Sequence, residues 1–290
     1  MRAFEFCAPR SLDEALALLA QYGEDARVVS GGTGLIHFLK QDLVQPAALV
    51  SLQHVPGLDA LDVGDGRVRA GARVSQRRME TSPELAAALP LASACYGHVA
   101  TVRIREAATV GGGLGQGDPA QDPPALWVAL GGSITLQSAT GTREVPAGEF
   151  WQDYYTTAVQ PGEIITAVSA PLPAPGTGWS YQKFLPRSED DYAAVSVACL
   201  LAMEQENNTI ASVRLGIGAC APTPLACPAL ADALVGQRPD EEVFAQAADL
   251  VRDLVDPLDD VRGSADYKRD MAVVFVRRAL VQAAARARAH

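Results

Sequence analysis

The stretch that decides the fold is ATVGGGLGQGDPAQDPPAL, residues 108–126. Its first half is rich in glycine and its second half in proline and aspartate, and no other part of the chain is as dense in turn-forming residues. This density predicts a loop over residues 109–124, followed by a helix over residues 125–130. Consecutive glycines let neighbouring backbone N–H groups converge on one point and let a ligand approach closely, which suits a phosphate.

A second glycine cluster, SGGTG at residues 30–34, follows a strand-like run at residues 27–30. Either cluster alone is also typical of an ordinary turn, because turns need glycine as well. Two clusters in one domain favour a ligand that carries a diphosphate, with the threonine hydroxyls as further donors.

Other nucleotide and hydrolase motifs do not fit. Gly115, Gly117 and Ala120 match the letters of the dinucleotide fingerprint G-x-G-x-x-A, but no strand-like run precedes them and three nearby prolines crowd the required helix. No Walker lysine follows either glycine cluster, and there is no G-x-S-x-G elbow. We therefore reject a Rossmann reading, and nucleotide hydrolysis is not expected.

Hydrophobic spacing and caps divide the rest of the chain. A capping box at residues 11–14 opens a helix that Gly23 ends. Further helices are predicted at residues 35–40, from Ser82 onward, and at residues 90–99, 224–234, 240–255 and 265–289. Strands are predicted at the start of the chain and at residues 27–30, 48–52, 61–70 (two, around an Asp-Gly turn), 134–137, 164–169, 179–184, 192–203 and 209–219.

The length and the linker predict two domains. The chain has 290 residues, about twice the usual domain size. Residues 170–178 hold three prolines and two glycines, which interrupt both strand and helix. We place the boundary near residue 175, with domains at 1–175 and 176–290 and with subdomains of the first at about 1–56 and 57–175.

Composition excludes several classes of partner. The formal net charge is −10, which disfavours nucleic acid and anionic membrane surfaces. No signal-peptide core is visible, and the longest apolar run, residues 193–203, is too short to span a membrane. The cysteines are scattered with no C-x-x-C pair, which suits neither disulfides nor a metal or iron–sulfur site: Cys7, Cys95, Cys199, Cys220 and Cys227. We expect a cytoplasmic protein with reduced thiols.

Taken together, these segments resemble the FAD-binding medium subunits of molybdenum hydroxylases, a family that includes carbon monoxide dehydrogenase and xanthine dehydrogenase. Residues 28–35 are similar to the family's A-G-G-T-D/S-L, and residues 108–126 are similar to A-T-I-G-G-N-L with its A-D-P-A-A-D-x-x-A-L extension. Weaker matches are VRIR at 102–105, YQKF at 181–184, RSEDDYA at 187–193 and RGSADYKR at 262–269. The resemblance covers nearly the whole chain.

The resemblance implies an α+β, two-domain FAD-binding fold of the vanillyl-alcohol-oxidase (PCMH) type, whose C-terminal domain has a three-stranded sheet and helices. It implies that FAD lies extended between the two glycine segments, with Asp122 accepting hydrogen bonds from it and with Lys183 and Tyr192 near the flavin ring. Without the alignment, Asp122 is more typical of a helix N-cap than of a cofactor ligand. The implied cofactor-binding residues are Val28, Val29, Ser30, Gly31, Gly32, Thr33, Gly34, Leu35, Val99, Ala100, Ala108, Thr109, Gly111, Gly112, Gly113, Gln116, Asp122, Ile165, Lys183 and Tyr192.

The implied function is electron transfer. A large molybdopterin subunit oxidises the substrate, a small [2Fe-2S] subunit relays the electrons, and FAD on this chain passes them to an acceptor, in a dimer of heterotrimers. The alternatives are a stand-alone FAD-dependent oxidase or dehydrogenase, and a non-catalytic subunit that has lost FAD. Gly34 stands where the family has Asp or Ser, and Gly113 where it has Asn, so each position lacks a side-chain hydrogen-bonding group.

Overall fold

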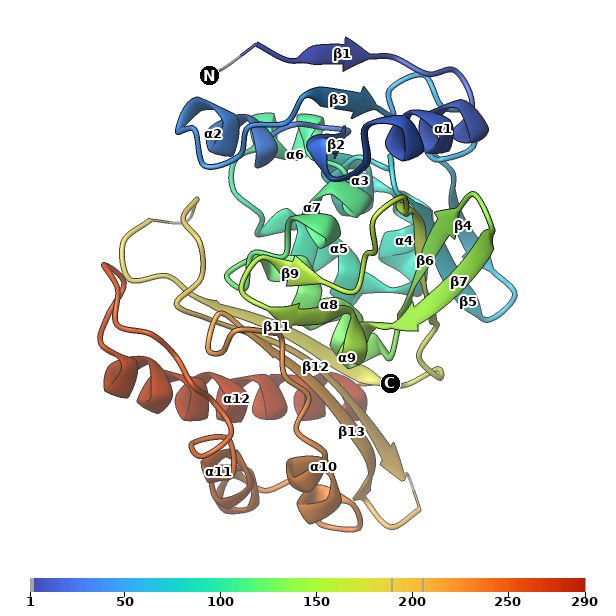
Figure 1. Ribbon diagram of the computed structural model, residues 1–290. Helices are drawn as coiled ribbons and strands as arrows, with labels where there is room; N and C mark the ends of the chain where they lie inside the picture. The colour runs from blue at the N-terminus through green and yellow to red at the C-terminus, as the bar shows by residue number, and fades with distance from the viewer. Residues whose placement is uncertain (1–2, 189, 205, 290) are drawn as a thin grey trace.

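The computed structural model describes residues 3–188, 190–204 and 206–289. Sheets of three, five and three strands, each with helices packed against it, follow one another from the N-terminal part to the C-terminal part of the molecule (Figure 1). Each sheet contributes to its own hydrophobic core.

The N-terminal part is a parallel sheet in the order β1-β3-β2, so β2 lies at an edge. Ser11 begins the first helix, because its hydroxyl accepts a hydrogen bond from the Glu14 N–H (3.1 Å). The elements are β1 (Glu5–Cys7), α1 (Leu12–Tyr22), a short 3-10 helix (Gly23–Asp25), β2 (Ala26–Val29), α2 (Leu35–Lys40) and β3 (Ala48–Ser51). The first glycine cluster directly follows the C-terminal end of the edge strand β2.

The middle part is an antiparallel sheet in the order β4-β5-β10-β6-β7. Its core includes Trp127, whose ring N–H donates to the Tyr96 hydroxyl (3.1 Å). The strands are β4 (Leu61–Gly64), β5 (Arg67–Gly71), β6 (Ser133–Ser138), β7 (Gly141–Pro146) and β10 (Ile164–Pro171), with a ribbon of β8 (Trp151–Asp153) and β9 (Thr156–Thr157). The helices are α3 (Gln76–Thr81), α4 (Pro83–Ala88), α5 (Pro90–Gly97), α6 (Val102–Ala107), α7 (Val110–Gln116), α8 (Asp122–Leu130) and α9 (Ala147–Phe150).

The C-terminal part is an antiparallel sheet with helices on both faces (Figure 1). The long helix α12 packs on β11 and β12, and α8 of the middle part packs on β12 and β13. A Cβ on Gly216 would stand 1.8 Å from the Ala125 carbonyl oxygen, so α8 approaches β13 as closely as backbone allows. The elements are β11 (Gly178–Phe184), β12 (Val195–Glu204), β13 (Thr209–Gly218), α10 (Pro228–Leu234), α11 (Glu241–Asp249) and α12 (Ala265–Arg288).

Most predicted elements are present, and the α+β class with its C-terminal three-stranded sheet and helices is confirmed. The loop predicted over residues 109–124 is wrong, because it contains α7 and the start of α8. Thr109 caps α7 and Gly117, in the left-handed conformation, ends it. The prolines after Asp122 occupy the first turn of α8, where a missing N–H costs nothing.

Other differences concern boundaries and short elements. The strand predicted from residue 192 begins at Val195, and the helix predicted to residue 255 ends at Asp249. Helices α3 and α6 and strands β7, β8 and β9 carry no periodicity strong enough to predict them. No helix in the described ranges has both the length and the apolarity to cross a bilayer. All five cysteines are free and buried, as the scattered spacing predicts.

Candidate FAD-binding site

The two glycine clusters lie against each other. A Cβ on Gly31 would stand 2.0 Å from the Ala107 carbonyl oxygen, immediately before the second cluster. A Cβ on Gly34 would stand 2.5 Å from the side-chain oxygen of Gln116, at the far end of α7. The segment of residues 31–34 therefore runs along α7, and glycine is required at Gly31 because backbone occupies the space.

The first cluster offers unpaired backbone donors. Within the described chain, the N–H groups of residues 31–35 have no hydrogen-bond partner, and pairing resumes at Ile36, whose N–H donates to the Gly32 carbonyl (3.0 Å). The segment is half-buried. Gly32 has a φ of +73°, which turns the chain so that successive N–H groups change direction. Such a run of free donors fits the oxygens of a diphosphate.

The second cluster does not offer its N–H groups in this way. The Val110 and Gly111 N–H groups donate to the Val74 and Ala72 carbonyls (2.9 and 2.8 Å). The next two N–H groups, of residues 112 and 113, donate to the hydroxyl (3.3 Å) and the carbonyl (2.9 Å) of Thr109. The interpretation of this segment as a cradle of N–H donors is therefore corrected, because its donors are satisfied within the chain.

What α7 offers instead is a face without side chains. Gly112 and Gly115 are exposed and stand one helical turn apart. Gly111 is buried and packs on Ala72, where a Cβ would stand 2.5 Å from the Ala72 side chain. A glycine in a helix costs about 1 kcal/mol relative to alanine, and α7 carries four in seven residues. The two exposed glycines leave room for a ligand to approach the helix backbone closely.

One apolar side chain, that of Ile165, borders this face. Val28 and Val29 are half-buried on the edge strand β2, and the Ile165 side chain lies 3.0 Å from where a Cβ on Gly115 would stand. Tyr192 is 46% exposed, with the Arg262 guanidinium 5.6 Å from its ring centroid. Partial burial, with Asp118 and Tyr155 nearby, raises the pKa of Tyr192 to about 12, so its hydroxyl is neutral at pH 7.

Asp122 and Lys183 interact with each other. The Lys183 ammonium donates to Asp122 Oδ2 (2.9 Å) and to the His98 carbonyl (2.8 Å), and the Tyr181 hydroxyl donates to Asp122 Oδ1. The two charged side chains are 1% and 4% exposed. Burial raises the pKa of Asp122, and Lys183 opposes that rise. The two charges neutralise each other, and the pair joins α8 to β11.

Val99 and Ala100 form a turn that Arg105 holds in place. The Arg105 guanidinium donates to both carbonyls (2.7 Å each) and pairs with the Glu80 carboxylate (2.7 Å). Ala100 has a φ of +38°, an unusual conformation that these bonds stabilise. Burial opposes ionisation of Glu80, but hydrogen bonds from Arg105 and Arg77 outweigh it and lower its pKa.

The structure thus brings most of the expected residues into one region and gives several a different role. Residues 28–35, the second cluster, Gln116 and Ile165 are contiguous, whereas Asp122, Lys183 and the turn at 99–100 form a separate group at the α8–β11 junction. The sequence analysis did not assign Gly115 to the site, because its exposure depends on the helical register of α7, and it did not assign Arg105 a role, although Arg105 lies within the VRIR match at residues 102–105. Gln121, the N-cap residue of α8, is half-buried and lies between the two groups, beside Gly113.

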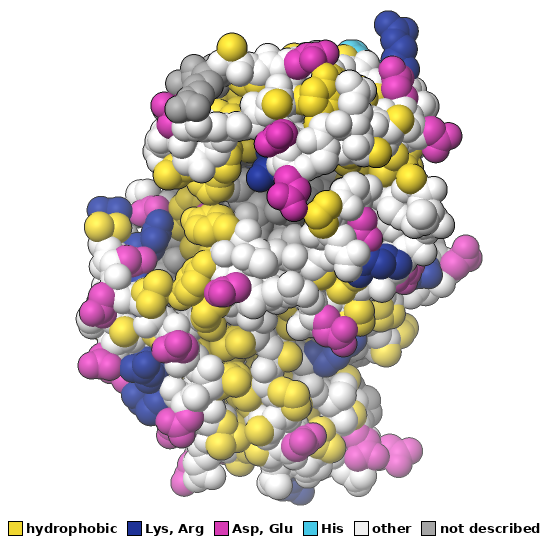
Figure 2. Space-filling model, in the orientation of Figure 1, with side chains coloured by type: hydrophobic (Ala, Val, Ile, Leu, Met, Phe, Trp, Pro, Cys, Tyr) yellow, Lys and Arg dark blue, Asp and Glu magenta, His cyan; other side chains and the backbone are white. Residues whose placement is uncertain are grey.

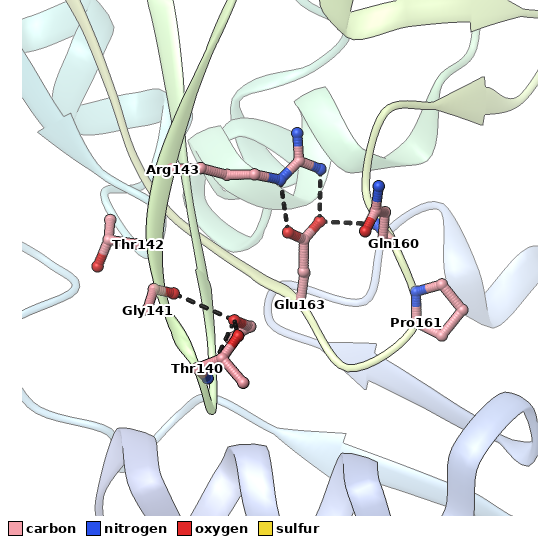
Figure 3. A pocket seen from close by; sticks show the side chains of 8 residues that line it. Thr140, Gly141, Thr142, Arg143, Gln160, Pro161 and Glu163 are labelled. Carbon is pink, nitrogen blue, oxygen red and sulfur yellow. Dashed lines mark hydrogen bonds and ion pairs between the residues drawn. The ribbon is translucent and has the colours of Figure 1, made fainter.

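An open cavity of about 470 Å³ lies elsewhere. It is formed by the β6–β7 hairpin and residues 160–163, and Figure 3 shows the Arg143 guanidinium facing the Glu163 carboxylate across two hydrogen bonds (2.6 and 2.7 Å). Because Glu163 neutralises Arg143, the cavity presents a satisfied ion pair rather than a free charge. None of its lining residues belongs to the glycine clusters.

The surface is consistent with the acidic composition. Charged side chains of both signs are scattered over the face that Figure 2 shows, without a large basic area. Among the residues that the structure describes, no group of three or more His, Cys, Asp or Glu side chains is placed to hold a metal ion.

Comparisons with known proteins agree with this geometry. Residues 2–173 match the model of the FAD binding domain in molybdopterin dehydrogenase, and residues 179–283 match that of the CO dehydrogenase flavoprotein C-terminal domain. The chain is 37% identical to the carbon monoxide dehydrogenase medium chain of Afipia carboxidovorans, covering 99% of this chain and 98% of that protein. It is 32% identical to the nicotine 6-hydroxylase medium subunit of Paenarthrobacter nicotinovorans, covering 98% of both.

Solved structures give the same result. A chain of the carbon monoxide dehydrogenase from Hydrogenophaga pseudoflava superposes with a TM-score of 0.95 at 34% identity, over 98% of both chains. The two-domain FAD-binding fold expected from the sequence is therefore confirmed.

Proposed function

Because this chain belongs to the family of FAD-binding medium subunits of molybdenum hydroxylases, we propose that it is the flavin-carrying electron-transfer subunit of a molybdenum-containing dehydrogenase. FAD, when bound, supplies the redox chemistry by accepting electrons and passing them to an external acceptor. The protein's own residues bind, orient and shield the cofactor.

One observation carries the proposal: the free N–H groups of residues 31–35 lie along the side-chain-free face of α7. The free donors suit the diphosphate oxygens, and Thr33 adds a hydroxyl from the same segment. The exposed Gly112 and Gly115 let the cofactor lie against backbone. Residues 28 and 29, with Ile165, provide apolar contact.

The proposed subunit organisation follows the family. We propose that the chain assembles with a small [2Fe-2S] subunit and a large molybdopterin subunit in the cytoplasm, as a dimer of heterotrimers, with domains at 1–175 and 176–290. The carbon monoxide dehydrogenase and nicotine 6-hydroxylase matches are named medium chain and medium subunit, which supports a multi-subunit enzyme.

Co-purification tests this function. A tagged chain, expressed with its neighbouring genes, is expected to bring down a large and a small subunit together with molybdenum, iron and FAD. Recovery of a flavin-containing monomer that oxidises an organic substrate by itself would favour the stand-alone oxidase. Recovery of the complex without flavin on this chain would favour the non-catalytic subunit.

A further inference from the structure

Tyr155 is an exposed aromatic residue in a backbone conformation that does not suit it. It lies in the turn between β8 and β9, it is 52% exposed, and its φ is +54°. Glycine and asparagine adopt this conformation readily, whereas a bulky side chain there is strained. Such strain persists only where the surrounding structure fixes the residue, so the contacts of Tyr155 require an explanation.

The backbone of Tyr155 is fixed against the end of α7. Its N–H donates to the Gly117 carbonyl (2.9 Å), and a Cβ on Gly117 would stand 3.0 Å from the Tyr155 carbonyl carbon. The Tyr155 hydroxyl donates to Asp118 Oδ2 at 3.4 Å. The backbone contacts explain where the turn lies, but they need no side chain and leave the aromatic ring unexplained.

The ring of Tyr155 contacts the helix that follows the first glycine cluster. Phe38, in α2, packs edge-on against it, with ring centroids 5.5 Å apart and an angle of 71° between the ring planes. This is the edge-to-face arrangement that aromatic pairs favour. Tyr155 therefore joins α2, in the N-terminal part of the molecule, to the end of α7, in the middle part.

The position of α2 determines the position of the donor segment, the free N–H groups of residues 31–35. Its start lies against backbone, because a Cβ on Gly31 would stand 2.0 Å from the Ala107 carbonyl oxygen. At its end, the contact between Phe38 and Tyr155 fixes α2. The next two N–H groups along the chain donate back into the segment and join it to α2: Ile36 to the Gly32 carbonyl (3.0 Å) and His37 to the Gly34 carbonyl (3.1 Å).

We propose that Tyr155 is a positioning residue for the cofactor, which acts through Phe38 to hold the donor segment in place beside α7. A segment that is fixed at both ends keeps its N–H groups in place before the ligand arrives, so binding pays less ordering entropy. Without the ring contact, only a fraction of the apo chain has the segment in place, and the apparent affinity falls by that fraction. The inference rests on the proposed function, in which this segment binds the diphosphate of FAD.

Two substitutions at Tyr155 in the full chain separate the ring from the turn. Tyr155→Asn removes the ring and keeps the turn, because asparagine tolerates a positive φ. We expect its FAD dissociation constant to rise roughly 2- to 12-fold, the most that one aromatic pair supplies. Tyr155→Phe keeps the ring, and its dissociation constant stays within about 2-fold of wild type. A flavin fluorescence titration measures both.

Amide hydrogen exchange of the apo chain distinguishes a local effect from a general loss of stability. In Tyr155→Asn, the amides of Ile36 and His37 exchange faster, because the hydrogen bonds that join the donor segment to α2 open more often. The amides of β5 and β10, in the middle sheet, exchange as in wild type.

The partner side of the contact gives an independent test. Phe38→Leu is expected to weaken FAD binding as Tyr155→Asn does. The double variant binds FAD no more weakly than the weaker single variant, because both changes remove the same contact. Phe6→Leu is the control: Phe6 is 59% exposed on β1, at the opposite edge of the N-terminal sheet from β2, and its replacement leaves FAD affinity unchanged.

Three results overturn the inference: wild-type FAD affinity in Tyr155→Asn, additive losses in the double variant, or exchange that becomes faster in the middle sheet as much as in α2. A wild-type chain that binds no FAD at all would instead refute the proposed function.

Discussion

At the scale of single residues, Asp122 and Lys183 show that residues expected near the cofactor also join two elements of the fold. Both match the family pattern, yet their charges neutralise each other inside the junction of α8 and β11. An ion pair this buried is costly to break, because removing one partner leaves the other charge without compensation.

The Lys183→Met variant tests this structural role. We expect it to lower the free energy of unfolding by about 3–5 kcal/mol at neutral pH. Burial already raises the native pKa of Asp122, and loss of the lysine removes the main opposing charge, so the native pKa rises further. A carboxyl with a raised native pKa stabilises the native state below its unfolded pKa of about 3.9 and loses that contribution as the pH rises through the native value.

The loss in the free energy of unfolding of Lys183→Met, relative to wild type, is therefore larger at pH 8 than at pH 5. Urea unfolding at the two pH values measures it. Lys40→Met, at an exposed lysine, serves as the control. The Asp122→Asn/Lys183→Met double variant regains part of the stability, since no buried charge remains. A deficit that does not change with pH, or a double variant that is no better than the single one, would contradict the structural role.

Gly31 makes the contact between the two glycine clusters. Gly31→Ala places a methyl group 2.0 Å from the Ala107 carbonyl oxygen, which is backbone and cannot rotate away. We expect a loss of about 1–3 kcal/mol in stability and a weaker hold on FAD. Gly64→Ala meets nothing within 4 Å and is the control for stability. Normal FAD affinity in Gly31→Ala would show that the clusters need not touch.

At the scale of elements, the composition of α7 explains why the sequence predicts a loop over residues 109–124 where the structure has a helix. Four glycines in seven residues contradict helix propensity. The helix depends on a local cap by Thr109 and on two tertiary hydrogen bonds, from the first two N–H groups of α7 to the carbonyls of residues 74 and 72. Capping boxes, proline positions and alternating strands were predictable because their causes are local. The register of α7 and the partners of Asp122 depend on segments far apart in the sequence.

Because the glycines of α7 lower its helix propensity, replacing one of them is expected to stabilise the apo chain and to weaken FAD binding. Gly115→Ala raises the helix propensity of α7 by up to about 1 kcal/mol, and its only close neighbour is the flexible end of Ile165, 3.0 Å away. We expect the apo chain to melt at the same or a higher temperature, while its FAD dissociation constant rises. Calorimetry of the apo form and a flavin titration measure the two effects. Unchanged affinity would mean that the exposed glycine face does not contact the cofactor.

At the scale of the whole molecule, α8 belongs to two cores at once. It is part of the core of the middle sheet and also covers one face of the C-terminal sheet. The Gly216→Ala variant would drive a methyl group into the Ala125 carbonyl oxygen, 1.8 Å away. We expect a stability loss at or above about 3 kcal/mol, since neither backbone can yield, and some loss of FAD, because α8 begins next to Gln121. A melting temperature within 1 °C or so of wild type would contradict this tight docking.

The flavin content of the assembled enzyme carrying Gly112→Val tests the central claim most directly. Gly112 is exposed on the face of α7 that carries no side chains, and a Cβ there meets only the capping Thr109 hydroxyl, at 2.9 Å. Gly148, in α9, is also an exposed helical glycine, and a Cβ there meets nothing within 4 Å, so Gly148→Val is the control for valine at an exposed helical position. We predict folded Gly112→Val protein that retains little FAD beside a Gly148→Val protein with about one FAD per chain. A full complement of FAD in Gly112→Val would contradict the assignment of this face to the cofactor.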